Sequence, residues 1–284
     1  DSKRPVYYLI VCSVVNIILD LLLILVIPLG VLGAAIATLI AQAVSAVLVT
    51  VTLMYRTEGM KLCLSQIRMY KRMLQSILKI GLPAGFEAIM YSISNIIVQV
   101  SINNFGVDTM AAWTAYSKID FIFWMINSAF GISVMTFVGQ NYGAGKWDRI
   151  RRGTKICLGM ALISAVSVSI ILMSAERFLF GIFVNDAGVV EIGIRMMNVI
   201  APAYLLFAFI EVFSGALRAQ GAVVVSTLIT MVGICVLRMI WVTLVAAHGT
   251  LEQVIICYPI TWAAGALAMS IYYIYKQRKI FQAR

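Results

Sequence analysis

Residues 6–28 read VYYLIVCSVVNIILDLLLILVIP, with one charged side chain, Asp20. An α-helix needs about 20 mostly apolar residues to cross the ~30 Å hydrocarbon core of a bilayer. In lipid, only helices and closed barrels satisfy their own backbone hydrogen bonds, and unbroken apolar runs indicate helices. Similar runs follow at 32–54, 80–102, 112–136, 154–174, 192–215, 223–246 and 252–275. The sequence therefore predicts an all-α integral membrane protein with eight transmembrane helices.

The composition agrees with a membrane protein. Apolar residues make up 62% of the chain, and the mean hydropathy is +0.97, which excludes a soluble fold. The net charge of +10 is expected to reflect topology and attraction to anionic lipid headgroups, so no nucleic-acid partner is predicted. The five cysteines show no metal-ligand spacing, and an odd count argues against a disulfide framework. No metal site is predicted.

The distribution of basic residues predicts the orientation. Of the 22 Lys and Arg residues, 18 fall on one side of the predicted membrane. Six of them lie between Arg56 and Lys79, and five lie between Lys146 and Lys155. Under the positive-inside rule this side is cytoplasmic. We therefore expect a multi-pass protein of the cell (inner) membrane with both ends of this chain in the cytoplasm.

The long connection at 56–79 separates two parts of the chain, 1–55 and 80–284. Within it, residues 67–74 alternate basic and apolar side chains at helical spacing, which predicts an amphipathic helix on the membrane surface. The first two spans are expected to form a hairpin with a tight turn at Pro28-Leu29-Gly30. The abrupt opening at Asp1, directly before a span, predicts that the sequence is a fragment.

Four stretches resemble the multidrug and toxic compound extrusion (MATE) family and together cover most of the chain. They are TFVGQNYGAGK at 136–146, GLP at 81–83, LRAQG at 217–221 and GVLGAAIATLIAQ at 30–42. The resemblance implies a monomeric transporter of twelve helices in two six-helix lobes. On that plan, 1–55 holds the last two helices of the first lobe, and 80–284 forms the second lobe. The first four helices of the first lobe are missing from this sequence, and the chain is expected to pack against them in the whole protein. Residues 222–225 depart from the family pattern, which leaves the conformation of that loop open.

The fourth span carries a stripe of aromatic and polar side chains that predicts a substrate site. The members are spaced 3, 4, 4 and 3 residues apart and fall within an arc of about 80°. A carboxylate among aromatic rings suits organic cations, through counter-charge and cation–π attraction. The alternative is an aromatic belt with a helix-packing face. The stripe consists of Trp113, Tyr116, Asp120, Trp124 and Asn127, and the last four are the predicted substrate ligands.

The third span carries a polar ridge with a four-residue repeat. The ridge drifts by about 40° at each step, so it faces one cavity only if the helix bends. Its middle members could line a substrate path, or they could make polar contacts between helices. The ridge consists of Glu87, Tyr91, Asn95, Gln99 and Asn103, of which Tyr91, Asn95 and Gln99 are predicted substrate ligands.

Ionisable residues inside a membrane are functional candidates, because burying them is costly. Glu87 and Glu211 are the predicted ion-coupling residues, since two close carboxylates would share a proton or a cation. The competing interpretation pairs Glu211 with Arg218. Asp20 and Arg238 occupy matching places in two similar hairpins, and the sequence leaves open whether they meet.

These residues and the resemblance predict a secondary active efflux transporter, not an enzyme. It would exchange drug-like, cationic small molecules for Na⁺ or H⁺ and need no cofactor beyond the coupling ion. The sequence contains no nucleotide-binding loop of the G-x-x-x-x-G-K-[ST] type, so ATP is not the expected direct energy source. The alternative is a lipid-linked oligosaccharide flippase. Four intramembrane acids against two bases disfavour it, because pyrophosphate needs a more basic cavity.

Overall fold

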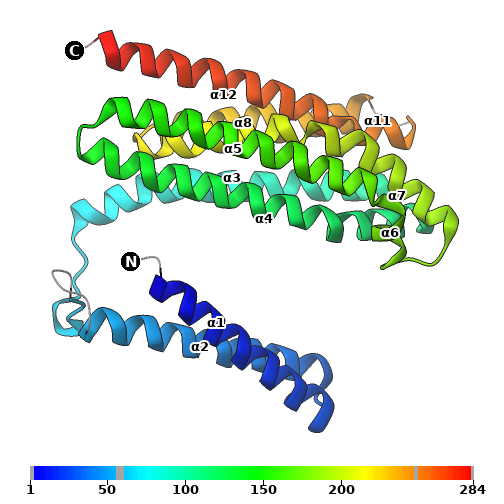
Figure 1. The fold of residues 1–284 in the computed structure, drawn as a ribbon, viewed down its shortest axis with the longest axis horizontal. Coiled ribbons are helices and arrows are strands. Elements are labelled where there is room, and N and C mark those ends of the chain that lie inside the picture. The colour runs from blue at the N-terminus through cyan, green and yellow to red at the C-terminus, as the bar shows by residue number, and fades with distance from the viewer. Residues whose placement is uncertain (1–2, 56–60, 246–248, 283–284) are drawn as a thin grey trace. The chain divides into compact units, whose positions relative to one another are not determined.

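A computed structural model describes residues 3–55, 61–245 and 249–282 of the chain (Figure 1). The chain forms two compact units, Asp1–Met73 and Leu74–Arg284. Within the described ranges, eight helical segments are long and apolar enough to cross a membrane, which confirms the predicted all-α, eight-span fold. These segments are Lys3–Val26, Gly30–Tyr55, Lys71–Asn103, Val107–Gly143, Trp147–Ser174, Ala187–Ala219, Val223–Val245 and Leu251–Ile280.

The first unit is a helical hairpin. Helix α1 (Lys3–Asp20) continues as a π-helical turn (Leu21–Val26), and α2 (Gly30–Tyr55) returns beside it. The predicted tight turn is confirmed, since Gly30 has a φ of 56°, which a residue without a Cβ adopts readily. Small side chains let α1 and α2 approach closely. The buried residues of α2 are Gly33, Ala37 and Ala41.

The connection after α2 differs from the predicted surface helix. A short 3₁₀ turn covers Leu64–Gln66, residues 67–70 have no regular structure, and α3 begins at Lys71. Residues 56–60 of the predicted linker lie outside the described residues. The basic and apolar residues at 71–74 therefore open a transmembrane helix, because the helical pattern runs on without a break into the apolar span. Pro83 accordingly lies in the interior of α3, not near its first turn.

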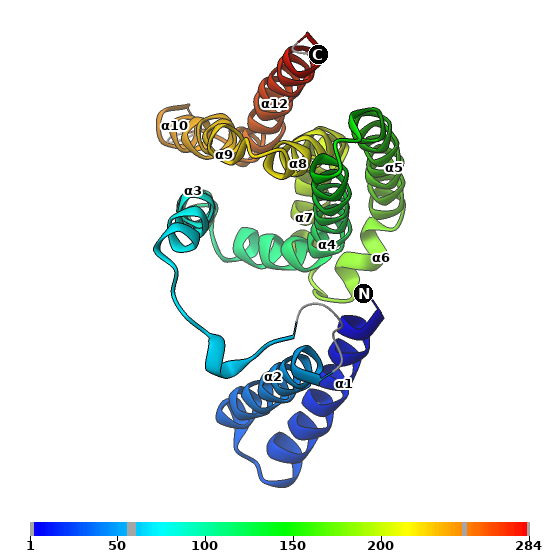
Figure 2. The same cartoon turned by 90° about the vertical axis from the view of Figure 1, so that its left-hand side faces the viewer.

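The second unit is an all-helical bundle centred on α8, which packs against α4, α5 and α12 (Figure 2). Its helices are α3 (Lys71–Asn103), α4 (Val107–Gly143), α5 (Trp147–Ser174), α6 (Glu176–Gly181), α7 (Ala187–Ile200), α8 (Tyr204–Ala219), α9 (Val223–Thr230), α10 (Leu237–Ile240), α11 (Leu251–Ile255) and α12 (Cys257–Gln282). A 3₁₀ turn at Ala201–Ala203, which contains Pro202, separates α7 from α8 within one span.

The seventh span is irregular along most of its length. Between α9 and the end of the span, a π-helical segment (Met231–Val236), the single turn of α10 and a second π-helical segment (Trp241–Val245) follow one another. π-Helical turns are uncommon and often occur at functional sites. Arg238 lies on α10, between the two π-helical segments.

Two of the quoted motifs are helix C-caps. Gly145 has a φ of 67°, and the Lys146 N–H donates to the Asn141 carbonyl at 2.9 Å. Gly221 has a φ of 79°, and the Ala222 N–H donates to the Leu217 carbonyl at 2.9 Å. Both are Schellman caps, which require a positive φ and favour glycine. Gly143, the other glycine of the first motif near this point, is still helical and is the last residue of α4. The segment 222–225, whose conformation the sequence left open, starts at Ala222 in this second cap and continues as the first turn of α9.

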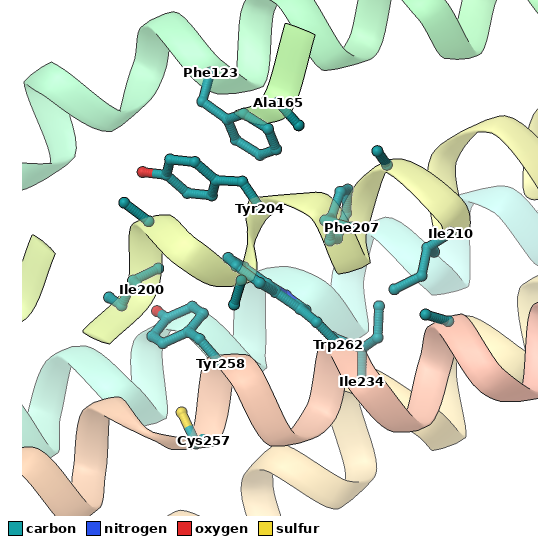
Figure 3. Close-up of a cluster of buried hydrophobic side chains, with 14 of the residues drawn as sticks. Phe123, Ala165, Ile200, Tyr204, Phe207, Ile210, Ile234, Cys257, Tyr258 and Trp262 are labelled. Atoms are coloured by element: carbon teal, nitrogen blue, oxygen red, sulfur yellow. The ribbon is translucent and has the colours of Figure 1, made fainter. Parts of the chain in front are cut away.

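Aromatic rings form the core between α4, α8 and α12 (Figure 3). The rings of Phe123 and Tyr204 stack with centroids 3.9 Å apart, and Trp262 meets Phe207 edge-on at 5.5 Å. At the crossing of α4 and α8, a Cβ added to Gly215 would lie 2.7 Å from the Gly131 carbonyl oxygen. Glycine at this crossing lets the two helices come together, and their side chains then define the cavities described next.

Candidate functional site

A cavity of about 430 Å³ lies between α3, α4, α7 and α12 in the second unit, and we call it the aromatic cavity. Rings from two widely separated parts of the sequence form most of its wall, and one carboxylate lies among them. Its lining consists of Tyr91, Asn95, Gln99, Trp113, Tyr116, Ser117, Asp120, Phe121, Trp124, Ile200, Tyr258 and Trp262.

Hydrogen bonds fix the carboxylate of Asp120. The Trp124 indole N–H donates to one oxygen at 2.5 Å, and the Tyr204 hydroxyl donates to the other. The Tyr116 hydroxyl lies 3.2 Å from that of Tyr204 and extends the network. Each carboxylate oxygen has a further lone pair, so the group can still accept from a ligand. The arrangement places one oriented negative charge on an otherwise uncharged, ring-lined wall.

Six of the seven predicted substrate ligands line the aromatic cavity: Tyr91, Asn95 and Gln99 from α3, and Tyr116, Asp120 and Trp124 from α4. The seventh, Asn127, is buried one turn further along α4 and does not line this cavity. Sequence reasoning missed Tyr258 and Trp262. Their four-residue spacing on the last span was the available signal, since it places both rings on one face of a helix.

The polar ridge of α3 divides between two cavities. Tyr91 lines both of them, Asn95 and Gln99 line the aromatic cavity, and Glu87 lines the second. Asn103 accepts a hydrogen bond from the Gln99 amide at 2.8 Å. Because the ridge drifts around the helix, its members therefore line two different cavities instead of one.

The second cavity has a volume of about 300 Å³, and we call it the charged cavity. It brings together both predicted ion-coupling acids and Arg218, with apolar residues around them. Its lining consists of Glu87, Tyr91, Gly131, Ile132, Met135, Phe207, Ile210, Glu211, Ser214, Gly215, Arg218 and Thr230.

The two acids of the charged cavity have different partners. Arg218 Nη2 donates to the two oxygens of Glu87 at 2.7 and 2.8 Å, and the Thr227 hydroxyl donates to Glu87 Oε2 at 2.9 Å. Among the described residues, Glu211 forms no hydrogen bond or ion pair. The alternative pairing of Glu211 with Arg218 is therefore not formed. Gly131 makes room for Glu211, because a Cβ at that position would overlap its carboxylate.

Arg238 is buried directly behind the aromatic cavity. Its side chain is 0% exposed, and its Nη1 donates to the Asn95 side-chain oxygen at 3.0 Å. Its guanidinium carbon lies 4.3 Å from the ring centroid of Tyr258, in cation–π contact. Within the described chain, its Nε and Nη2 have no hydrogen-bond partner. Asp20 belongs to the first unit, so the question that the sequence left open, whether it meets Arg238, stays open.

Three polar contacts tie the middle of α3 to the helices that follow α7. Glu87 binds Arg218 of α8 and Thr227 of α9, and Asn95 binds Arg238 of α10. Because both cavities are lined in part by α3, a change of charge at Glu87 would alter the attachment of a wall that the two cavities share.

Comparison with known proteins identifies the family. Residues 83–244, more than half of the chain, match the sequence model of the MatE family. The chain belongs to this family. Its match begins in α3 and ends in the seventh span, so it contains most residues of both cavities.

Two curated relatives and a solved structure match most or all of the chain. The probable multidrug resistance protein YoeA of Bacillus subtilis is 28% identical over 99% of this chain, and the multidrug export protein MepA of Staphylococcus saprophyticus is 25% identical over 82%. A crystal structure of MATE in the bent conformation aligns over 100% of the chain with a TM-score of 0.89 at 18% identity. The chain spans 63% of the length of YoeA and of that structure, and 54% of MepA. The resemblance found in the sequence is thereby confirmed.

Proposed function

We propose that this chain is part of a MATE transporter that exports drug-like, cationic compounds in exchange for Na⁺ or H⁺ and that works as a monomer in the cell membrane. One observation carries the proposal: a ring-lined cavity with a fixed carboxylate lies next to a cavity with two acids and an arginine, and α3 lines both. The names of YoeA and MepA, which refer to multidrug resistance and export, support it.

The aromatic cavity suits a flat organic cation. Its rings offer stacking surface and cation–π attraction, and Asp120 is the only charged residue in its lining among the described residues. A pyrophosphate group would meet a carboxylate there instead of basic side chains. The cavity therefore favours export of cations over transfer of a lipid-linked oligosaccharide.

The charged cavity suits ion coupling. Arg218 neutralises Glu87, while Glu211 presents a carboxylate without a protein partner. A proton or Na⁺ that binds to these acids competes with Arg218 for Glu87. Release of Glu87 would loosen the attachment of α3 to α8 and α9, and a ligand shifts a conformational equilibrium when it binds one state better. The coupling ion would in this way act on the wall shared with the substrate.

Transport by the full-length protein in vesicles tests the proposal. We expect an amphipathic fluorescent cation to move against its gradient when an opposing Na⁺ or pH gradient is imposed, and to stop when that gradient is collapsed. Vesicles without protein provide the control. Equal transport with and without any ion gradient would refute antiport, and gradient-independent movement of a lipid-linked oligosaccharide would favour the flippase instead.

The proposed orientation makes a separate prediction about Cys63, an exposed free cysteine in the connection between α2 and α3. In a variant that retains only this cysteine, a membrane-impermeant thiol reagent should label it in inside-out vesicles and not in intact cells, because the basic residues around it face the cytoplasm. The matched control is the cysteine-free protein with Asn185→Cys, in the loop before α7, which should give the reverse pattern. Labelling of Cys63 in intact cells would overturn the topology.

A further inference from the structure

A third cavity lies between the first turns of α5 and the last turns of α12, and it shares no lining residue with the two cavities above. It has a volume of about 360 Å³. Three of its six lining residues are basic, and they come from two helices. We call it the basic cavity, and its lining consists of Arg151, Lys155, Tyr273, Ile274, Gln277 and Arg278.

The buried hydroxyl of Tyr273, a residue that lines the basic cavity, has no partner in hydrogen-bonding geometry among the described residues. The Thr154 side chain lies beside it, but Thr154 is 1% exposed and does not line the cavity. Phe213 of α8 stacks on the Tyr273 ring at 4.5 Å and holds it in place. Leaving a buried hydroxyl unpaired is unfavourable, so an acceptor oxygen from a ligand would complete the site.

The end of α12 is held firmly beside the basic cavity. Lys276 donates to the Gln220 carbonyl at 2.9 Å, and the Gln277 amide donates to the Gln220 side chain at 3.0 Å. The cavity is therefore built on fixed helices and does not depend on a loop. Three basic groups and the Tyr273 hydroxyl around one space match a phosphate, which carries negative charge and several acceptor oxygens.

An apolar track leads from the basic cavity along the outside of α12. Arg278, Ile274, Ile271 and Leu267 are spaced 4, 3 and 4 residues apart and lie within an arc of about 60° on one face of the helix. The three apolar residues are 49%, 59% and 64% exposed. The transmembrane segment containing them ends at Ile280, so Arg278 lies at its boundary and the track enters the span. A phosphate attached to an acyl chain fits both features.

We propose that the basic cavity binds the headgroup phosphate of an anionic phospholipid, with an acyl chain along the α12 track. Arg151, Lys155 and Arg278 neutralise the phosphate, and the hydroxyl of Tyr273 donates a hydrogen bond to one of its oxygens. Basic pockets between transmembrane helices on the cytoplasmic side bind anionic lipid headgroups in this way. The bound lipid would link α5 and α12 across α8.

Native mass spectrometry of the full-length protein tests this site, with phosphatidylglycerol and phosphatidylcholine of the same acyl chains as probes. We expect one tightly retained phosphatidylglycerol. The double variant Lys155→Gln/Arg278→Gln should lower its affinity by roughly 30-fold, because each basic group near an anionic headgroup contributes about fivefold. The matched control is Arg152→Gln/Lys279→Gln, which removes the same charge from neighbouring positions outside the cavity lining and should retain the lipid.

Tyr273→Phe keeps the ring stacked on Phe213 and keeps all basic groups. If this variant stays folded but binds phosphatidylglycerol more weakly, the result supports the site independently. Equal retention of the two lipids by the unaltered protein would overturn the proposal. Equal loss in the double variant and its matched control would also overturn it, since surface charge alone would then explain binding. If inorganic phosphate binds with the same dependence on Lys155 and Arg278 and no lipid binds, the lipid proposal is wrong. The ligand of the cavity would then be a soluble phosphate compound.

Discussion

Asp120→Asn should lower transport of organic cations by roughly 10- to 100-fold while leaving a neutral analogue of similar shape much less affected. The carboxylate faces a ring-lined cavity that holds no other charged lining residue within the described chain. A hydrogen bond to a charged group contributes about 1.5–3 kcal/mol, and each 1.4 kcal/mol corresponds to about a factor of ten in affinity. The asparagine keeps the shape of the side chain and removes its charge.

The measurement compares a matched pair of fluorescent substrates, one cationic and one neutral, in vesicles containing the full-length protein. Asparagine also disturbs the local network, because its NH₂ group cannot accept the bond that Trp124 or Tyr204 donates. Tyr204→Phe is therefore the control, since it removes one donor and keeps the negative charge. It should affect both substrates alike. Equal losses for both substrates in Asp120→Asn would show that Asp120 positions the cavity wall without serving as counter-charge.

The stripe on α4 could be predicted because its members share one helix. A period of 3.6 residues places side chains three and four positions apart on one face, and Tyr116, Asp120 and Trp124 do line one cavity. Tyr258 and Trp262 complete the same cavity from α12, and their own periodicity is equally clear. The period of a helix, however, carries no information about which other helix it faces, so the opposite wall could not be predicted.

The partner of Arg218 shows the same limit in more detail. Seven residues separate it from Glu211 on α8, which is about 10.5 Å along the helix axis. The sequence-based pairing of these two would have to span that distance, whereas Glu87 approaches from α3 at 2.7 Å. A contact between residues 87 and 218 depends on how two spans pack, which local pattern does not encode. A helix C-cap is by contrast a local feature, and the positive φ of Gly145 with the Lys146 hydrogen bond marks Gly145, not Gly143, as its glycine.

The charged cavity gives the second large expected effect. Glu87→Gln and Glu211→Gln should each reduce transport driven by an ion gradient by roughly 5- to 150-fold, the range of typical coupling free energies between two sites. Glu211→Gln removes the carboxylate that has no protein partner and keeps the contacts of α3. Glu87→Gln instead removes the anion that holds Arg218 and Thr227, so it should also lower thermal stability. Substrate binding measured without a gradient should persist in Glu211→Gln, because the aromatic cavity does not include that residue.

Two further variants separate ion coupling from a general effect of lost charge. Glu191→Gln removes an exposed acid that pairs with Arg177 outside both cavities, and it should transport normally. Gly131→Ala removes no charge, but its Cβ would occupy the place of the Glu211 carboxylate, so it should impair coupling as Glu211→Gln does.

Normal gradient-driven transport in both glutamine variants would remove Glu87 and Glu211 from the mechanism. The ion would then have to act at Asp120 or at an acid outside this chain, and the ion pair of Glu87 with Arg218 would serve only to attach α3 to α8.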